Sequence, residues 1–214
     1  MTRTFTFVAL FCALLHNSCN KNSSQEFSSD DFPNAEGDQW SYSRYDSINS
    51  TYDTVHVIIS DTIASGTTVQ GIWDFTFTNS KNPYVSDYYY RVSILSGTVI
   101  FENSLYGLAE HRFLFPIQIS DEWTLEREFY HDTTRVVSSE DFILPDNSIR
   151  TAYRIIQHVG RPDGNSCSEA YYSFWIIPDI GIVRYRENVF IGTKCPATMV
   201  TNEEWNLLNY QLAQ

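Results

Sequence analysis

Short runs of alternating apolar and polar residues dominate the chain from residue 39 onward, and this period of two is typical of strands with one buried face. Residues 54–59 and 73–77 show it most clearly. The pattern predicts strands at residues 39–46, 53–60, 68–78, 87–95, 98–103, 122–130, 134–140, 150–159, 170–177 and 182–190. Turn-forming residues separate them, as at 79–83, 145–147 and 161–165. Residues 203–212 fit either a last strand or a short helix, and both stay open.

Ten consecutive strands with short connections predict an antiparallel meander. Such a sheet has two edges, so it must curl, close or fold over to protect them. The predicted fold class is therefore all-β, with about ten strands forming a barrel or a half-barrel.

Two segments of the chain are alike, which indicates an internal duplication within one β domain, residues 32–214. Both contain Phe-Pro, three further residues, a small residue, Asp, any residue and Trp, and they occupy residues 32–40 and 115–123, 83 positions apart. A second similarity, an aromatic run that leads to Gly97 and again to Gly181, has an offset of 84. The predicted repeat units are about 32–108 and 115–192. The alternative is that turns and strands of similar composition arose independently.

An apolar run at the N-terminus predicts export. Arg3 precedes residues 5–15, a run of 11 residues that suits a signal peptide and is too short to span a membrane, which takes about 20 residues. The run ends just before Ser18-Cys19, and the chain then becomes polar. We therefore expect a signal peptide at residues 1–18, followed at residues 19–31 by a lipidated Cys and a flexible tether.

The Ser18-Cys19 junction resembles a bacterial lipoprotein signal, in which the Cys is lipidated and becomes the first mature residue. His16 stands where such signals usually have Leu, so an ordinary cleaved signal peptide is the alternative. Asn20, rather than Asp, follows the Cys, and the resemblance then implies no retention in the inner membrane. We expect an outer-membrane lipoprotein on the periplasmic or cell-surface face.

Composition narrows the possible partners. Aromatic residues make up 15% of the chain, which favours strands, and the formal net charge is −12. Arg3 is the only charged residue of the leader, so the mature chain carries 13 basic against 26 acidic groups. A surface this negative repels phosphate backbones and anionic lipid headgroups, which argues against nucleic-acid binding and leaves the lipid anchor as the expected membrane contact.

Two cysteines remain after the leader and Cys19, namely Cys167 and Cys195. If the hairpin between them turns at Asp179-Ile180, opposite residue numbers sum to about 359, which places Cys167 opposite residue 192 and near Cys195. We predict a disulfide, which would contribute about 3.5 kcal/mol by loop closure, with two free thiols as the alternative. No further Cys or His lies at ligand spacing, so neither a metal site nor a cofactor is predicted.

The usual catalytic motifs are missing from the sequence, including Gly-x-Ser-x-Gly, His-Glu-x-x-His and a phosphate-binding Gly loop. The histidines of the mature chain have no evident catalytic partner in the sequence and are predicted to be structural or exposed: His56, which should face solvent, His111, His131, in a turn, and His158. Glu126 and Glu128 share one face of a predicted strand, where a solvated surface is favoured over acid–base chemistry. Glu187, beside Arg184 and Arg186, is predicted to be a surface charge.

The second half of the chain carries a family resemblance. An aromatic strand, residues 172–175, precedes a hairpin that continues Gly181-Ile182-Val183-Arg184-Tyr185. This resembles a broad group of uncharacterised Bacteroidota lipoproteins, in which such a strand precedes a Gly-x-Gly-hydrophobic-Val-basic-aromatic hairpin. Asp179 replaces the first Gly here. The resemblance covers about residues 32–190 and implies a curved antiparallel sheet and an envelope location, but no catalytic residues.

Three roles without catalysis stay open. The first is a binding or scaffold module for a partner protein or small ligand. The second is a carrier that holds an apolar ligand, which a cavity lined by Phe and Trp would favour and a packed core would disfavour. The third is glycan binding through exposed aromatic residues, for which the candidates are Tyr88, Tyr89 and Tyr90 unless they only pack. A hydrolase with dispersed residues is least favoured.

Overall fold

The computed structural model describes residues 28–65, 68–79, 89–103, 110–126, 131–160, 168–192 and 197–213. In these ranges a short 3-10 helix precedes twelve strands. They are η1 (Ser29–Asp31), β1 (Gln39–Asp46), β2 (Thr51–Ser65), β3 (Thr68–Phe77), β4 (Tyr89–Leu95), β5 (Thr98–Asn103), β6 (Glu110–Leu114), β7 (Glu122–Glu126), β8 (His131–Ile143), β9 (Ile149–Gly160), β10 (Glu169–Ile177), β11 (Gly181–Ile191) and β12 (Thr198–Gln211).

All twelve strands belong to one antiparallel sheet, in the order β6-β5-β4-β3-β2-β1-β12-β11-β10-β9-β8-β7. The first six strands form one meander and the last six form another. The two meanders join where the first strand pairs with the last, β1 with β12. Strands β6 and β7 are the two edges, so the sheet is open. The prediction of an all-β barrel or half-barrel is thus confirmed in its half-barrel form.

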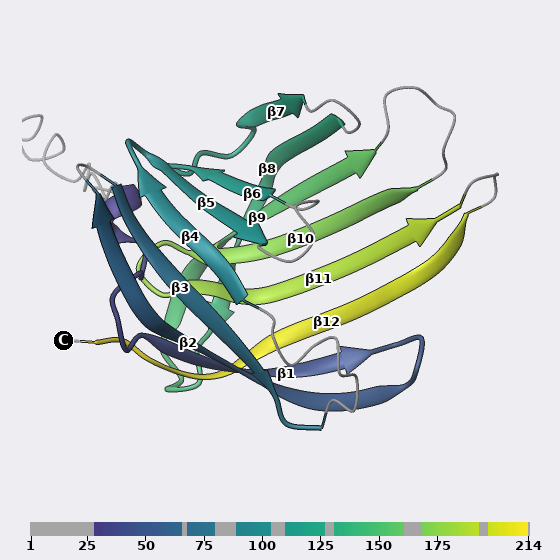
Figure 1. Ribbon diagram of the computed structural model, residues 1–214, viewed down its shortest axis with the longest axis horizontal. Coiled ribbons are helices and arrows are strands. Elements are labelled where there is room, and N and C mark those ends of the chain that lie inside the picture. Colours follow the sequence, from purple (N-terminus) through teal and green to yellow (C-terminus); the bar gives the residue numbers. More distant parts are fainter. Residues whose placement is uncertain are drawn as a thin grey trace, which may run out of the picture.

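The sheet is strongly curled, and β4–β6 lie over the strands of the second meander (Figure 1). Ring contacts show where the two halves meet, because His111 and Phe113 of β6 pack edge-on against Phe174 of β10, with centroids 4.9 and 5.0 Å apart. Curling buries apolar area on the concave face and shortens the distance between the edges.

The two Phe-Pro segments have the same backbone geometry. Gly37 and Ser120, the small residues of the two copies, both have positive φ, +91° and +76°. Each copy then makes the same pair of backbone hydrogen bonds to the following long strand, all at 2.9 Å. In the first copy, Gly37 N donates to Ile59 O and Ile59 N donates to Asp38 O. In the second copy, Ser120 N donates to Val136 O and Val136 N donates to Asp121 O. Two six-stranded units therefore repeat the same local structure in the same order. Their common origin stays a prediction.

The strand predictions are accurate where the apolar alternation is strong and incomplete elsewhere. The described residues form twelve strands rather than about ten, because β6 is only five residues long and the pattern of β12 fits both a strand and a helix. Residues 203–211 lie in a strand, not a helix, since β12 (Thr198–Gln211) pairs on both sides. His131 begins β8 instead of lying in a turn.

Turn chemistry was predicted more accurately. Ser96 and Gly97, with φ of +44° and +85°, join β4 to β5, and this pair of positive φ values is why a glycine is needed. In the hairpin of β10 and β11, Glu169 lies opposite Phe190 and Tyr171 opposite Asn188, so opposite numbers sum to 359 as expected. Cys167 and Cys195 lie outside the described residues, and the disulfide stays a prediction.

One end of the half-barrel is filled by a buried aromatic core. Trp40 stacks on Trp73 with centroids 4.6 Å apart, and Phe32 also stacks on Trp73, at 6.1 Å. Both indoles have acceptors, since Trp40 Nε1 donates to Ile180 O at 2.8 Å and Trp73 Nε1 to Asn34 Oδ1 at 2.9 Å. Full burial with satisfied donors makes this end rigid. In the described part of the chain, no helix has the length and apolar character needed to cross a bilayer. The leader and Cys19 lie outside that part.

Candidate functional site

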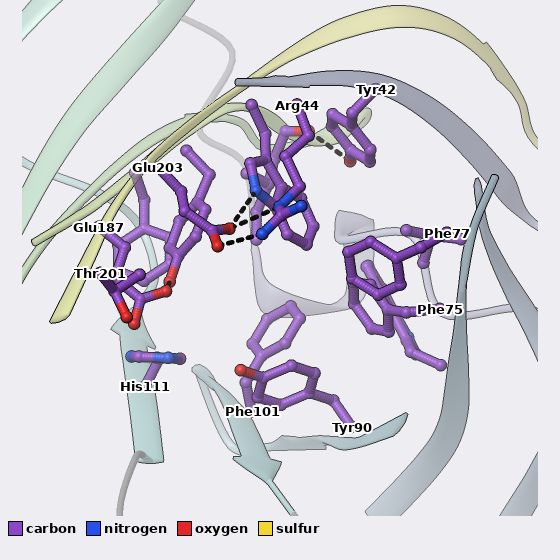
Figure 2. A pocket seen from close by; sticks show the side chains of 16 residues that line it. Tyr42, Arg44, Phe75, Phe77, Tyr90, Phe101, His111, Glu187, Thr201 and Glu203 are labelled. Atoms are coloured by element: carbon purple, nitrogen blue, oxygen red, sulfur yellow. Dashed lines mark hydrogen bonds and ion pairs between the residues drawn. The ribbon is translucent and has the colours of Figure 1, made fainter. Parts of the chain in front are cut away.

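The other end of the concave face is hollow. A cavity of about 220 Å³ lies there, and nine of its sixteen lining residues are aromatic. It is bounded by β1 and β12 at the centre of the sheet and by strands from both meanders. Figure 2 shows Phe75, Phe77 and Tyr90 around the cavity, with Arg44 and Glu203 bonded to each other on its wall.

The period of two in each strand builds this cavity. Trp73, Phe75 and Phe77 are alternate residues of β3, and all three line it. Alternate residues of β12 do the same, namely Thr201, Glu203 and Trp205. Side chains two apart point to the same face of a sheet, so each strand supplies a row of groups. Each row changes from fully buried near the core to less buried farther along, as from Trp73 to Phe77.

Trp205 is the centre of the aromatic wall. Its ring contacts Tyr185 and Phe77 edge-on, with centroids 5.4 and 5.9 Å apart, and Phe75 at 6.1 Å. Tyr42 lies 6.1 Å away and donates its hydroxyl to Ile182 O at 2.8 Å. Burial raises the pKa of Tyr42, so it stays a neutral donor. These rings give the cavity a preformed apolar surface.

A charged pair interrupts this apolar wall. Arg44 Nε donates to Glu203 Oε2 at 2.8 Å, and Arg44 Nη2 donates to Glu203 Oε1. Trp205 Nε1 also donates to Glu203 Oε2, at 3.1 Å, and the Arg44 guanidinium lies 5.5 Å from the Phe77 ring centre. The hydrogen bonds to Glu203 raise the pKa of Arg44. A two-pronged pair of this kind holds both side chains in a defined geometry.

Glu187 is the second carboxylate of the cavity and lies directly opposite Glu203 in the pairing of β11 with β12. Burial raises its pKa, and repulsion from Glu203 raises it further. The hydroxyl of Tyr185, 2.6 Å from Glu187 Oε2, and the charge of Arg44 act the other way, and the pKa is about 7. The prediction that Glu187 is a surface charge is wrong. Arg184 and Arg186 point to the convex face, and Glu187, one residue on, points inward.

His111 was also assigned no partner, yet the fold supplies one. Its ring is 4% exposed and lines the cavity, and its Nδ1 lies 2.6 Å from Gln157 Oε1. Gln157 Nε2 in turn donates to Glu110 O at 3.0 Å. The partners come from β6 and β9, which are far apart in the sequence, so no local pattern could reveal the pair.

Of the three tyrosines predicted to contact a ligand, the structure describes only one side chain. Tyr90 lines the cavity and packs edge-on against Phe75 at 5.4 Å. Tyr88 lies outside the described residues, and the side chain of Tyr89 does too, although its backbone belongs to β4. The role of all three as ligand contacts stays a prediction.

The remaining candidates lie away from the cavity. His56 is exposed as expected and lies 2.9 Å from Ser41 Oγ. Glu126 is exposed at the end of β7, and Glu128 is not among the described residues. In the described part of the chain, no group of three or more His, Cys, Asp or Glu side chains is placed to hold a metal ion.

Comparison with known proteins finds relatives of this fold only among solved structures. Neither a protein-family model nor a curated protein matches the sequence. A protein of Parabacteroides distasonis, provisionally described as a lipoprotein, aligns over 87% of this chain and 99% of its own, with 13% identity and a TM-score of 0.52. A protein of Bacteroides fragilis, provisionally described as exported and as having a YmcC-like fold, also aligns over 87% of this chain and 99% of its own, with 13% identity and a TM-score of 0.49. The first of these likenesses shows that the chain adopts a known all-β fold.

Proposed function

We propose that this protein is an exported, lipid-anchored binding protein that holds an apolar ligand in the hollow end of its half-barrel. The role is non-catalytic and belongs to the cell envelope, with the outer membrane as the expected site. The apolar run at residues 5–15 and Cys19 support export and anchoring. The aromatic cavity supports ligand binding.

The cavity is the observation that carries the proposal. A protein core is normally packed without voids, and a space of about 150 Å³ lined by apolar groups is enough to hold benzene. The cavity here, about 220 Å³, has room for a small ring system or a short hydrocarbon segment. A pure scaffold would need a packed interior instead. The cavity therefore favours the carrier alternative over the scaffold.

Filling the cavity from within tests this role. Thr201 lines the cavity from β12, and the variant Thr201→Trp places an indole in the space. The matched control is Thr198→Trp, at an exposed position of the same strand. N-phenyl-1-naphthylamine, a neutral dye that brightens in apolar sites, serves as the probe. We expect the parent and the control to bind the dye and Thr201→Trp to bind it about tenfold more weakly or worse. Equal titration curves for all three proteins would refute a ligand-binding cavity.

The anchor is tested in cells. Labelled palmitate should mark the parent and not Cys19→Ala, because the thioether-forming Cys is then missing. If both proteins carry the same label, the lipid is not on Cys19.

A further inference from the structure

We infer that the ligand is an organic cation, an amine or quaternary ammonium group attached to a small apolar body, and that Glu187 receives its charge. This inference rests on the proposed function and specifies its ligand. The apolar body would lie against Phe75, Phe77 and Trp205, and the charged group would lie at the Glu187 side of the cavity (Figure 2).

Two carboxylates, Glu187 and Glu203, line the cavity together with one permanently charged cation, Arg44. Glu203 already neutralises Arg44. Glu187, opposite Glu203, has one described hydrogen bond, from the neutral hydroxyl of Tyr185. Two like charges directly opposite each other on neighbouring strands repel. A bound cation would relieve this repulsion and pair with the second carboxylate.

The neighbouring strands add more negative charge. Asp46 of β1 and Asp53 of β2 are both 9% exposed, and both act electrostatically on Arg44. Backbone amides satisfy them, from Ile48 and Asn49 for Asp46 and from Thr54 and Asn79 for Asp53. His111 of β6, Tyr90 of β4 and Tyr42 of β1 complete the titratable groups among the described lining residues. The carboxylates that act on Arg44 therefore outnumber its single positive charge.

An anionic ligand fits the charged groups of the cavity less well than a cation does. It would have to take Arg44 from Glu203, and this would leave two carboxylates unpaired in a partly buried site. Phosphate and carboxylate groups are disfavoured for this reason. The ring walls act in the same direction, because aromatic faces attract cations, and Arg44 over Phe77 is already such a contact.

Binding should depend on pH through Glu187. A cation prefers the ionised carboxylate, so a proton on Glu187 competes with the ligand. The pKa of Glu187 is about 7, and affinity should therefore rise as the pH increases through that value and level off above it.

Three probes that differ in one group test the charge of the ligand. Phenethylamine, phenethyl alcohol and phenylacetate share a ring and differ in being cationic, neutral and anionic. Calorimetry or displacement of N-phenyl-1-naphthylamine at about pH 8 would give their affinities. We expect the amine to bind about tenfold more tightly than the alcohol and the acid to bind most weakly. For the amine, affinity should fall by a similar factor at about pH 6.

Glu187→Gln should remove the preference for the amine and its pH dependence while leaving the alcohol bound. The isosteric amide keeps an acceptor for Tyr185, and Glu122→Gln, an exposed carboxylate on edge strand β7, is the control. If the dye binds but the alcohol or acid matches the amine, the cation inference is overturned and the cavity stands. If dye and probes all fail to bind the parent, the proposed function itself fails. The pH profile of the parent decides the question even where a variant does not fold.

Discussion

At residue 71 the concave face has no room for a side chain. A Cβ built on Gly71 would overlap Asn34 Oδ1 and lie 3.0 Å from its Cγ. Asn34 is buried in the loop before β1, where it accepts from Trp73 Nε1 and donates to Val92 O at 3.3 Å. A single amide therefore connects the loop to β3 and β4. A glycine beside it is a packing requirement rather than a turn signal.

Gly71→Ala should lower the free energy of unfolding by about 2–3 kcal/mol, because the methyl group must displace Asn34 and leave buried polar groups without partners. Urea titration followed by tryptophan fluorescence measures the change. Gly160→Ala, in β9, is the control, since its nearest contacts are 3.4 Å away and belong to the movable ring of His158. Equal losses in the two variants would contradict the argument.

At the scale of elements, successive residues of β11 point to the two opposite faces of the sheet. Tyr185 and Glu187 line the cavity, while Arg184 and Arg186 reach Glu204 of β12 on the convex face. Arg184 also covers Trp175, with its guanidinium 4.9 Å from the ring centre. The strand thus holds the centre of the sheet together from outside while it shapes the site inside.

The ion pairs on the convex face predict that the free energy of unfolding falls at acidic pH. Burial acts to raise the pKa of Glu204, but the bonds from Arg184 and Arg186 outweigh it and lower the pKa from 4.5 to about 2. A carboxyl whose pKa is lowered by folding stabilises the native state above its unfolded pKa, and this contribution disappears as the pH falls from 4.5 towards 2. The loss should be about 1–3 kcal/mol, because the side chain is 25% exposed.

Urea titrations at several acidic pH values measure this slope. Glu204→Gln should be less stable than the parent at neutral pH and should lose less stability below pH 4.5. If the parent and the variant show the same decline, other carboxyl groups cause it.

At the scale of the whole molecule, the first and the last strand meet at the centre of the sheet, and strands from between them in the sequence form its edges. β12 pairs with β1 and β11, whereas β7 pairs only with β8. Ala213 N donates to Asp38 Oδ1 at 2.7 Å, which fixes the end of the chain beside the first turn. In the sheet, the two six-stranded units are therefore joined at one seam, the pairing of β1 with β12.

Substitution of one tryptophan at the β1–β12 seam and of another at the β7 edge compares how much each region contributes to the free energy of unfolding. Trp205 of β12 is 9% exposed and lies among four aromatic rings, and Trp205→Ala should cost about 3–5 kcal/mol. Trp123 of β7 is half-buried, and its indole N–H is buried without an acceptor among the described residues, so Trp123→Ala should cost only about 1–2 kcal/mol. Chemical denaturation measures both. A cost at the edge as large as that at the seam would contradict a structure held by β1 and β12.

The sequence by itself determined the features that depend on neighbours along the chain. The period of two placed most strands, the Ser96-Gly97 turn followed from the demand for positive φ, and the β10–β11 register followed from its turn. The repeated Phe-Pro segments also predicted two alike units, and their backbone hydrogen bonds agree.

Only the tertiary structure decided which strands meet across long separations and which face of a strand is hollow. The pairing of β1 with β12, the contact of His111 with Gln157 and the inward position of Glu187, directly after the outward Arg186, all depend on how the sheet curls. Alternation says that neighbours face opposite ways, but it does not say which way is inside when both faces carry polar groups. The cavity lies where rows of alternate side chains converge, and that convergence exists only once the sheet has curled.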